Sequence, residues 1–242
     1  MNIVGIIPAR YASSRFPGKP LVVLKGKTMI QRVYEGAKKS QTLSKVIVAT
    51  DDQRIFDEVL RFGGKAQMTS EKHTTGTDRC GEVAQGLNAD IIINIQGDEP
   101  LVDYRQLDQL CTAFQDKNVA IATLGIKKVS EEDRQNPNRI KIVLDRQCNA
   151  LYFSRSPIPN TANATPEVVD QMDLYRHIGL YAYRKETLME LINLKKTLLE
   201  QVESLEQLRW MYNGYNIRVV ETTIETPNID VPADIEKVLN AL

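Results

Sequence analysis

The loop that follows the first apolar run carries residues suited to binding a strongly charged anion. The stretch IIPARYASSRFPGKPL, residues 6–21, brings together three permanent cations and two hydroxyls: Arg10, Arg15, Lys19, Ser13 and Ser14. Each close pair of opposite charges is worth roughly 4 kcal/mol at an effective dielectric constant near 20, so three cations can offset much of the charge of a triphosphate. Three prolines and Gly18 also fix the backbone, and an unconstrained surface loop gains nothing from such rigidity. We predict a polyphosphate-binding loop; the alternative is a solvated basic loop.

This loop differs from the common phosphate-binding motifs. Position 13 is serine where a Walker loop has glycine, and Lys19 is followed by proline where a Walker loop has serine or threonine. The chain also has no G-x-G-x-x-G fingerprint. An ordinary ATPase and a dinucleotide-dependent dehydrogenase are therefore disfavoured.

A carboxylate suited to magnesium follows a second apolar run. In NIQGDEPL, residues 94–101, Gln96 and Gly97 precede Asp98. Magnesium prefers a few carboxylates together with substrate phosphates, so we predict that Asp98 holds a metal bridging the triphosphate. The alternative, a helix N-cap, fits Asp103 better, because Asp98 lies too far before the helix expected from Tyr104.

Two further segments offer weaker candidates. Asp230 stands before a helix that starts near a proline and is a second candidate metal ligand, whereas Asp234 suits the first turn of that helix. The stretch KHTTGTDR, residues 72–79, supplies hydroxyls, including that of Thr75, around Gly76. Such a loop either binds a nucleotide base or is a capped turn.

Short apolar runs alternate with helical patterns in the first half of the chain. The segments 3–7, 45–50, 91–96 and 119–124 are rich in Val and Ile and predict buried strands. Helical faces lie between them, at 29–37 and 55–60. Alternating strands and helices predict an α/β fold with a mostly parallel sheet flanked by helices. Ligands of such sheets bind beyond the carboxyl ends of the strands, which is where Arg10 and Asp98 fall.

The second half breaks this rhythm, which suggests a small inserted subregion. Residues 139–154 predict two strands, and 156–173, rich in Pro, Asn and Thr, predict a loop. Beyond it we expect strands at 177–183 and 217–222 and helices at 186–192, 198–212 and 233–241. We expect one domain over 1–242, divided into parts at about 1–130, about 131–215 and 216–242, the last of which is a C-terminal strand and helix.

Composition excludes several classes of partner. Lys plus Arg and Asp plus Glu both number 31, so no net field favours nucleic acid or an anionic membrane. The first apolar run is far shorter than a signal core or a membrane span, which predicts a cytoplasmic protein. The three cysteines are widely spaced without C-x-x-C pairing, which argues against disulfides or zinc and predicts small buried apolar residues.

Seven motifs in a fixed order point to a family: PARYASSRFPGKPL, VIVATDD, HTTGTDR, NIQGDEPL, ALYFSR, RHIGLYAYR and SLEQLR. The chain closely resembles the 3-deoxy-manno-octulosonate cytidylyltransferases, nearly end to end. The resemblance implies a Rossmann-like α/β nucleotidyltransferase fold, with a nucleotide-binding part at about 1–130 and a small inserted sugar-binding and dimerisation part at about 131–215. It also implies a homodimer that uses CTP and Mg²⁺ to activate a 3-deoxy octulosonic acid with CMP for lipopolysaccharide synthesis.

The resemblance also implies roles for individual residues. Arg10 and Lys19 would hold the triphosphate, Asp98 and Asp230 would coordinate Mg²⁺, and the remaining residues would form the sugar-acid pocket: Gln96, His177, Tyr181, Glu206 and Gln207, with Arg15 and Arg155 assisting. Without the resemblance, Tyr181 reads as a core strand residue. Glu206 and Gln207 then read as the solvated face of a helix that buries Leu205 and Leu208.

Three functions compete at this point. The first is attack of the sugar's anomeric hydroxyl on the α-phosphorus of CTP, with loss of pyrophosphate. The second is a related enzyme, either a cytidylyltransferase for another sugar acid such as the 8-amino analogue or a glycosyltransferase, although the D-x-D pair typical of the latter is absent at Asp98. The third is a binding module without turnover, which has no need for a metal carboxylate beside a triphosphate.

Overall fold

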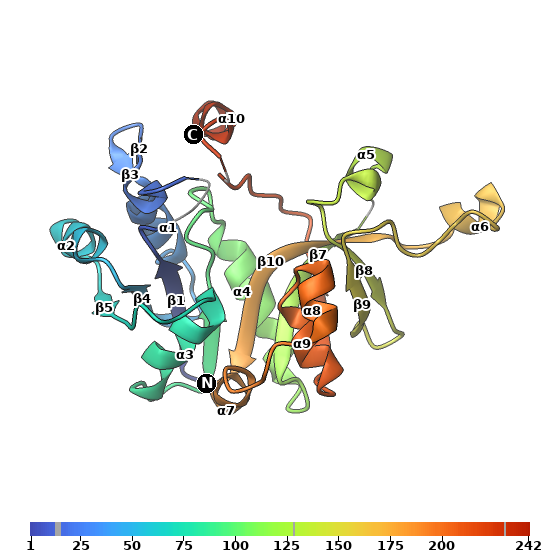
Figure 1. The fold of residues 1–242 in the computed structure, drawn as a ribbon, viewed down its shortest axis with the longest axis horizontal. Coiled ribbons are helices and arrows are strands. Elements are labelled where there is room, and N and C mark those ends of the chain that lie inside the picture. Colours follow the sequence, from blue (N-terminus) through green and yellow to red (C-terminus); the bar gives the residue numbers. More distant parts are fainter. Residues whose placement is uncertain (13–15, 128, 230) are drawn as a thin grey trace. The chain divides into compact units, whose positions relative to one another are not determined.

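The computed structural model describes residues 1–12, 16–127, 129–229 and 231–242. They form two compact units, coloured along the chain in Figure 1. The first unit comprises Met1–Cys111, Leu180–Ile192 and Glu225–Leu242, and the second comprises Thr112–Gly179 and Asn193–Ile224. The parts expected at about 1–130, 131–215 and 216–242 are a division by role and stay a prediction.

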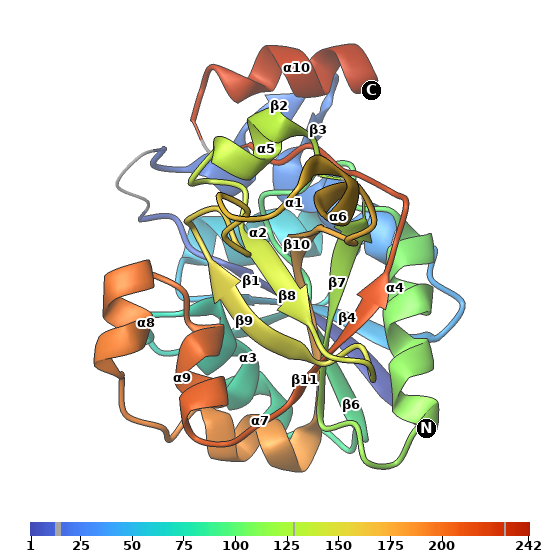
Figure 2. The ribbon, with the colours of Figure 1, turned by 90° about the vertical axis from the view of Figure 1, so that its right-hand side faces the viewer.

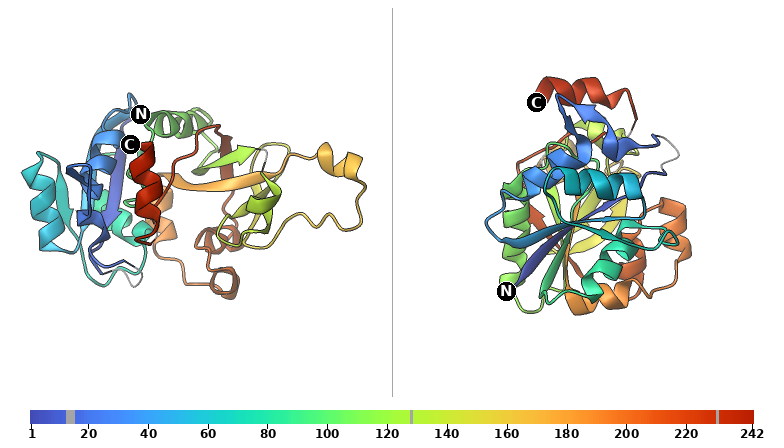
Figure 3. Two further views of the ribbon diagram at one scale, coloured as in Figure 1. Left: turned by 90° about the horizontal axis from the view of Figure 1, so that it is seen from above. Right: turned by 90° about the vertical axis from the view of Figure 1, so that its left-hand side faces the viewer.

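The first unit is built on a parallel sheet in the spatial order β6-β1-β4-β5. Its strands are β1 (Ile3–Ala9), β4 (Leu43–Thr50), β5 (Ala66–Met68) and β6 (Ile91–Asn94). The second half of β10 (Tyr175–Arg184) adds an antiparallel neighbour, with Ala182 opposite Ile93. The centre of β1 and most of β6 are fully buried, as expected for strands covered on both faces, and the right-hand view of Figure 3 shows helices on both sides.

Several helices of the first unit begin after a residue whose side chain caps them. The helices of this unit are α1 (Met29–Ala37), α2 (Gln53–Arg61), α3 (Gly76–Gln85), most of α4 (Tyr104–Thr112), α7 (Lys185–Leu191) and α10 (Asp234–Ala241). Thr28 and Asp52 accept hydrogen bonds from the first turns of α1 and α2. Asp103 accepts one from the backbone of Arg105 at 2.9 Å, so the cap expected for α4 is confirmed.

Strand order creates a switch point beside β1. The chain runs from β1 outward to β4 and β5 and then returns to β6 on the other side of β1. Ile6 of β1 lies opposite Asn94, the last residue of β6. The loops after Ala9 and Asn94 therefore leave the sheet side by side, at the place where open α/β sheets bind ligands.

The second unit combines a parallel pair with a hairpin. β7 (Ile121–Lys127) is parallel to β11 (Ile217–Glu221), and β8 (Lys141–Leu144) and β9 (Ala150–Ser154) form the hairpin visible in Figure 2. The first half of β10 pairs with β8. The short helices of the second unit are η2 (Ala113–Gln115), α5 (Glu131–Gln135), α6 (Pro166–Asp170), α8 (Leu198–Glu203) and α9 (Gln207–Tyr212). The expected loop over 156–173 thus contains one short helix.

One expected helix is wrong: 198–212 is two helices. Ser204 ends α8 with left-handed backbone angles, φ 52° and ψ 47°, and the Leu205 amide bonds back to the Glu200 carbonyl at 3.1 Å. A left-handed residue after the last turn is a common way to close a helix. The apolar spacing continues across this break, which is why periodicity alone joined the two segments.

The chain returns to the first unit at its C-terminal end. Figures 2 and 3 show α10 beside the small strands β2 (Val23–Leu24) and β3 (Lys27–Thr28). Leu24, Met29, Ile229 and Val238 form one buried apolar cluster there. This packing holds the segment before α10 next to the loops that follow β1 and β6.

The expected α/β class, a mostly parallel sheet flanked by helices, is confirmed. No helix in the described part of the chain is long and apolar enough to cross a membrane. Cys80 and Cys111 are buried, as expected, but Cys148 is exposed. Cys148 occupies the turn between β8 and β9 with φ 60°, and a turn at a hairpin tip has no core to enter.

Candidate active site

A polar cleft of about 250 Å³ opens in the first unit at the carboxyl ends of β1 and β6. The residues around it come from four segments: Pro8, Ala9 and Arg10; Lys19 and Pro20; His73, Thr74, Thr75, Gly76 and Arg79; Gln96, Gly97 and Asp98. Five residues assigned from the sequence to the nucleotide, the metal or the sugar acid therefore share one cleft: Arg10, Lys19, Thr75, Gln96 and Asp98. Ser13, Ser14, Arg15 and Asp230 lie outside the described residues.

Lys19 is held in place by the backbone before it and by two acceptors. Gly18 has φ 72°, a left-handed conformation that favours glycine, and it caps the short helix η1 (Lys19–Leu21). The Lys19 Nζ donates to Asp98 Oδ2 at 2.8 Å and to the Ile229 carbonyl at 2.8 Å. Only 13% of the Lys19 side chain is exposed, so this ammonium is a positioned charge and not a solvated one.

Asp98 reaches the cleft because a glycine lets its loop approach β1. A Cβ atom on Gly97 would lie 2.8 Å from the Pro8 carbonyl oxygen, which is too close for any other residue without a shift. The Asp98 carboxylate is part-exposed at the cleft. Arg10, the first residue after β1, is exposed at the same cleft. Two cations and one carboxylate therefore meet where a metal-bound triphosphate needs them.

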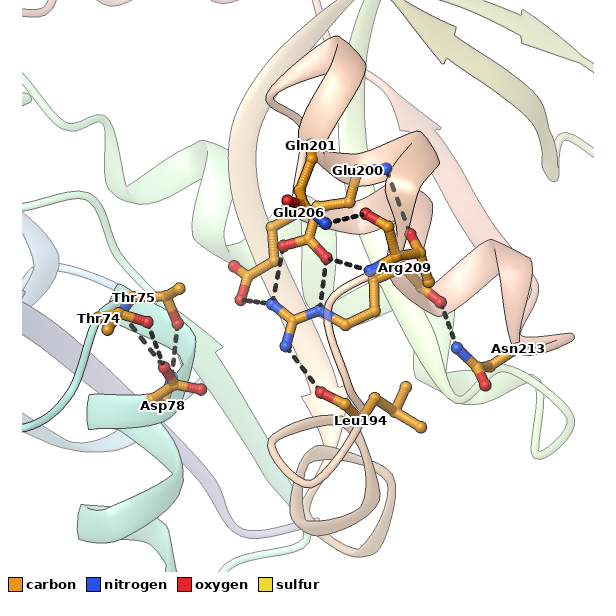
Figure 4. A network of polar contacts seen from close by, with 10 residues as sticks. Thr74, Thr75, Asp78, Leu194, Glu200, Gln201, Glu206, Arg209 and Asn213 are labelled. Atoms are coloured by element: carbon orange, nitrogen blue, oxygen red, sulfur yellow. Dashed lines mark hydrogen bonds and ion pairs between the residues drawn. The ribbon is translucent and has the colours of Figure 1, made fainter.

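Thr75 has a structural role that the sequence left open. It is the N-cap of α3, and its Oγ1 accepts from the Asp78 amide at 3.0 Å while Asp78 accepts from the Thr75 amide at 3.2 Å. Thr74 Oγ1 also lies 3.5 Å from the Asp78 carboxylate, as Figure 4 shows. The capped turn is confirmed. The same turn borders the cleft, and the nucleotide-binding role of Thr75 stays a prediction.

Sequence reasoning missed Arg79, a buried cation at the cleft. Its side chain is 4% exposed; Nη2 lies 2.7 Å from Asp51 Oδ2, and Nη1 donates to Thr69 Oγ1. Asp51 follows β4 and Thr69 follows β5, so the ion pair and the hydrogen bond together tie two strand ends to α3. Arg79 belongs to the HTTGTDR stretch, but only the fold shows which face of α3 it occupies.

Glu99 is a second missed carboxyl group. Burial and, to a smaller extent, the negative charge of Asp98 raise the pKa of Glu99 to about 8, although a hydrogen bond from Thr226 Oγ1 at 3.2 Å acts in the opposite direction. The neighbouring side chains of Asp98 and Glu99 thus have different environments. The sequence, which simply places two acidic residues together, does not distinguish them.

The described residues suit a magnesium ion that is bound partly by the protein and partly by the phosphates of a nucleotide. Among them, no group of three or more His, Cys, Asp or Glu side chains is arranged to hold a metal. Asp98 offers one carboxylate at the cleft, and Mg²⁺ is commonly held by one or two carboxylates together with substrate phosphate oxygens. A self-sufficient protein cage is not needed for such a metal.

His177, on the second-unit half of β10, is held as a neutral ring. Its Nε2 lies 2.9 Å from Thr123 Oγ1, and Phe153 meets the ring edge-on at 5.2 Å between centroids. Burial lowers the pKa of His177 to about 3. The imidazole therefore acts as a hydrogen-bonding group and not as a cation near neutral pH.

Tyr181 belongs to the first unit, where it is buried on β10 opposite Asn94 of β6. Its ring stacks with that of Tyr183 at 6.1 Å. A core position on a strand, the alternative weighed from the sequence, is therefore observed. Its proposed contact with a sugar acid stays a prediction.

Gln207 is not on a solvated helix face. It is 5% exposed at the start of α9, and its Nε2 has no hydrogen-bond partner among the residues that the structure describes. A buried amide without a partner costs free energy, which a bound ligand with an acceptor atom would relieve. The solvated interpretation is wrong for Gln207, and the binding interpretation keeps its physical basis.

Glu206 and Arg155 are each engaged with neighbours in the second unit. Glu206 Oε1 lies 2.9 Å from Arg209 Nη2, and Arg209 also pairs with Glu200 at 3.0 Å (Figure 4). The Arg155 guanidinium donates to the carbonyls of Glu203, Pro137 and Ser204. Arg155 thus satisfies carbonyl groups at the end of α8. Substrate contacts of both residues stay predictions.

Comparisons with known proteins agree on one family. A family model described as cytidylyltransferase matches residues 4–222. A 3-deoxy-manno-octulosonate cytidylyltransferase of Geotalea daltonii is 47% identical, covering 100% of this chain and 98% of the relative, and one of Parabacteroides distasonis is 50% identical, covering 99% and 97%. The solved structure of a CMP:2-keto-3-deoxy-manno-octonic acid synthetase complexed with CTP is 44% identical, with a TM-score of 0.93 over 100% of this chain and 98% of that chain.

Proposed function

This chain belongs to the 3-deoxy-manno-octulosonate cytidylyltransferases, and we propose that the cleft at the carboxyl ends of β1 and β6 is where it transfers CMP from CTP to the sugar acid. The observation that carries this proposal is the meeting of Arg10, Lys19 and Asp98 in one cleft. Two of these groups match a triphosphate and the third matches the metal that accompanies it. A binding module without turnover has no use for that third group.

The reaction needs alignment and charge neutralisation more than it needs a protein nucleophile. The anomeric hydroxyl oxygen of the sugar attacks the α-phosphorus, the bond from that phosphorus to the bridging oxygen of the β-phosphate breaks, and pyrophosphate leaves; the hydroxyl proton passes to solvent. Lys19 and Arg10 offset negative charge on the phosphates during this step. The backbone at Gly97 and the turn at Thr75 shape the cleft around the nucleotide.

Asp98 would hold Mg²⁺, with Asp230 as a second ligand. When bound, the ion would polarise the phosphates and neutralise their charge. Lys19 Nζ lies 2.8 Å from Asp98 Oδ2. This ion pair compensates the charge of a carboxylate in a half-buried site.

The sugar acid would be recognised by polar groups with fixed orientations. Gln96 borders the nucleotide cleft, and the neutral ring of His177 and the buried amide of Gln207 offer hydrogen bonds to hydroxyl groups. Tyr181, Glu206, Arg155 and Arg15 complete the proposed pocket. Sites that hydrogen-bond substrate hydroxyls discriminate strongly, because the wrong sugar leaves their buried polar groups unpaired.

The remaining expectations rest on the family. We propose a homodimer that works in the cytoplasm and supplies an activated sugar for lipopolysaccharide. The second unit exposes Leu198, Val202 and Tyr212, with exposed fractions of 80%, 83% and 71%, around one groove of about 860 Å³. Large apolar side chains grouped on a surface are typical of protein–protein contacts, and a second copy of the chain is the partner that the family provides.

A substrate panel tests the function directly. The purified chain is incubated with CTP, Mg²⁺ and, separately, 3-deoxy-manno-octulosonate, its 8-amino analogue and an unrelated sugar acid. We expect a CMP-sugar by mass and equimolar pyrophosphate with the octulosonate. Product from the 8-amino analogue alone would reassign the substrate, and CTP binding without any product would favour a binding module.

A further inference from the structure

The main chain of Ile229 joins the two groups that define the cleft. Its amide donates to the Asp98 carbonyl at 3.0 Å, and its carbonyl accepts from Lys19 Nζ at 2.8 Å. Ile229 comes from the C-terminal segment, more than a hundred residues from either partner in sequence. One residue therefore fixes both the loop that carries Asp98 and the ammonium that pairs with it.

The Ile229 side chain anchors this bridge in the core. It is 0% exposed and packs in one cluster with Leu24, Met29 and Val238. Five partly buried side chains pack against this cluster: Phe16, Val22, Leu101, Ile235 and Leu239. Val238, Ile235 and Leu239 belong to α10, so the packing of this helix determines where the Ile229 backbone lies.

A second tie connects the same segments. Thr226 Oγ1 donates to Glu99 Oε2 at 3.2 Å, three residues before the Ile229 bridge. The C-terminal segment thus binds the loop after β6 through two consecutive acidic residues, by the backbone at Asp98 and by the side chain at Glu99. A segment held at two points and by a buried anchor has little freedom to shift.

The carbonyl of Ile229 has a specific electrostatic use. A lysine ammonium has three donors, and Lys19 gives one to Asp98 and one to Ile229. If the Asp98 carboxylate turned to a cation, the Ile229 carbonyl would still be an acceptor that holds Nζ at the cleft. The ammonium would then stay directed into the cleft.

We propose that Ile229 is a positioning residue for Lys19 and Asp98. In this proposal the packing of α10 against Ile229 determines how tightly the cleft binds a nucleoside triphosphate. The proposal rests on the proposed function only in taking the cleft as the triphosphate site. It assigns a role to the C-terminal helix, which contributes no residue to the lining of the cleft.

The test compares three truncations of buried aliphatic side chains in the full-length chain. Ile229→Ala removes the anchor, Val238→Ala loosens α10, and Leu188→Ala is the matched control. Leu188 is also 0% exposed, but it lies on α7. This helix starts directly after Arg184, which pairs with Ile91, the first residue of β6. Leu188 is therefore near the amino end of β6, whereas the cleft lies at its carboxyl end. All three variants should lower the melting temperature.

The readouts are the Kd for CTP by calorimetry, with and without Mg²⁺, and the separate values of kcat and KM. We expect Ile229→Ala to raise the Kd by about 10-fold or more, the order expected for losing a hydrogen bond to a charged group, and Val238→Ala to raise it less. Leu188→Ala should stay within about 2-fold of the unchanged chain, and Ile229→Val should restore most of the affinity.

Two results would overturn the proposal. The first is that Ile229→Ala or Val238→Ala lowers the stability but leaves the Kd for CTP unchanged. The second is that Leu188→Ala raises this Kd as much as Ile229→Ala does. If Ile229→Ala fails to fold, Val238→Ala decides the question alone. Failure of the proposed function would look different, because the unchanged chain would then bind CTP without forming a CMP-sugar, and the Kd comparison would still stand.

Discussion

Lys19 Nζ and Asp98 Oδ2 lie 2.8 Å apart, although 79 residues separate them in the sequence. The pair joins the group proposed to neutralise phosphate charge to the group proposed to hold the metal. The two proposed roles are separate, so each residue can be tested by a substitution that leaves the other in place.

Lys19→Ala should lower kcat for pyrophosphate release by a factor of about 10² to 10³, the typical loss when one preorganised charge donor is removed from a reacting centre. The fold should survive, because Lys19 lies on a loop helix of three residues. Lys27→Ala is the control, since that lysine is exposed and pairs with Glu35. A folded Lys19→Ala variant with nearly full activity would remove Lys19 from the mechanism.

Asp98→Asn should abolish magnesium-dependent pyrophosphate release, because an amide keeps the shape but lacks the charge that a hard divalent cation prefers. Asp230→Asn should act in the same way. Asp103→Asn is the matched control: it changes the cap of α4, outside the residues around the cleft, and should cost a little stability only. The measurement is activity across a magnesium titration, and an unchanged titration curve for Asp98→Asn would place the metal elsewhere.

Gln207→Ala should raise the KM for the octulosonate by about 10-fold or more while leaving CTP binding within about 2-fold, since one or two net hydrogen bonds of roughly 1 kcal/mol each are lost. Because Nε2 of this buried amide has no hydrogen-bond partner among the described residues, its removal should cost the folded chain little stability. Gln201→Ala, on the exposed face of α8, serves as control. Equal weakening for both substrates would contradict the pocket assignment.

Acid should destabilise the protein partly through His177. The folded-state pKa of about 3 lies below the ordinary value of 6.5, so the unfolded chain binds the proton more readily. Stability is then full above pH 6.5 and is lost as the pH falls toward 3, by at most about 1.4 kcal/mol per pH unit from this one group. His177→Gln should flatten the dependence of the unfolding free energy on pH between 4.5 and 6.5. Parallel curves for the two proteins would show that His177 is not the group responsible.

The groove of Leu198 and Val202 should lie between two copies of the chain. Val202→Asp introduces a charge at a side chain that is 83% exposed, and it should convert a dimer to a monomer in light scattering at micromolar concentration without unfolding it. Leu60→Asp is the control, because Leu60 is also exposed but lies on α2 of the first unit. A dimer that survives Val202→Asp would place the interface on another surface.

The sequence by itself determined the α/β class, most strands, and the charged loops that meet at one edge of the sheet. It could do so because parallel strands all end at the same edge, so residues that directly follow β1 and β6, such as Arg10 and Asp98, are neighbours in any such fold. The motifs near Lys19, Asp98 and Gln207 then narrowed the activity to a single family.

Only the tertiary structure decided which partners these residues have. The apolar periodicity predicted one helix through Ser204. It could not show the break, because a helix break depends on one backbone conformation and not on apolar spacing. Arg79 and Glu99 gain their character from burial, which sequence spacing does not report. Ile229 reaches Lys19 and Asp98 because the chain leaves the first unit and returns, and contacts between distant segments follow from packing that no local pattern encodes.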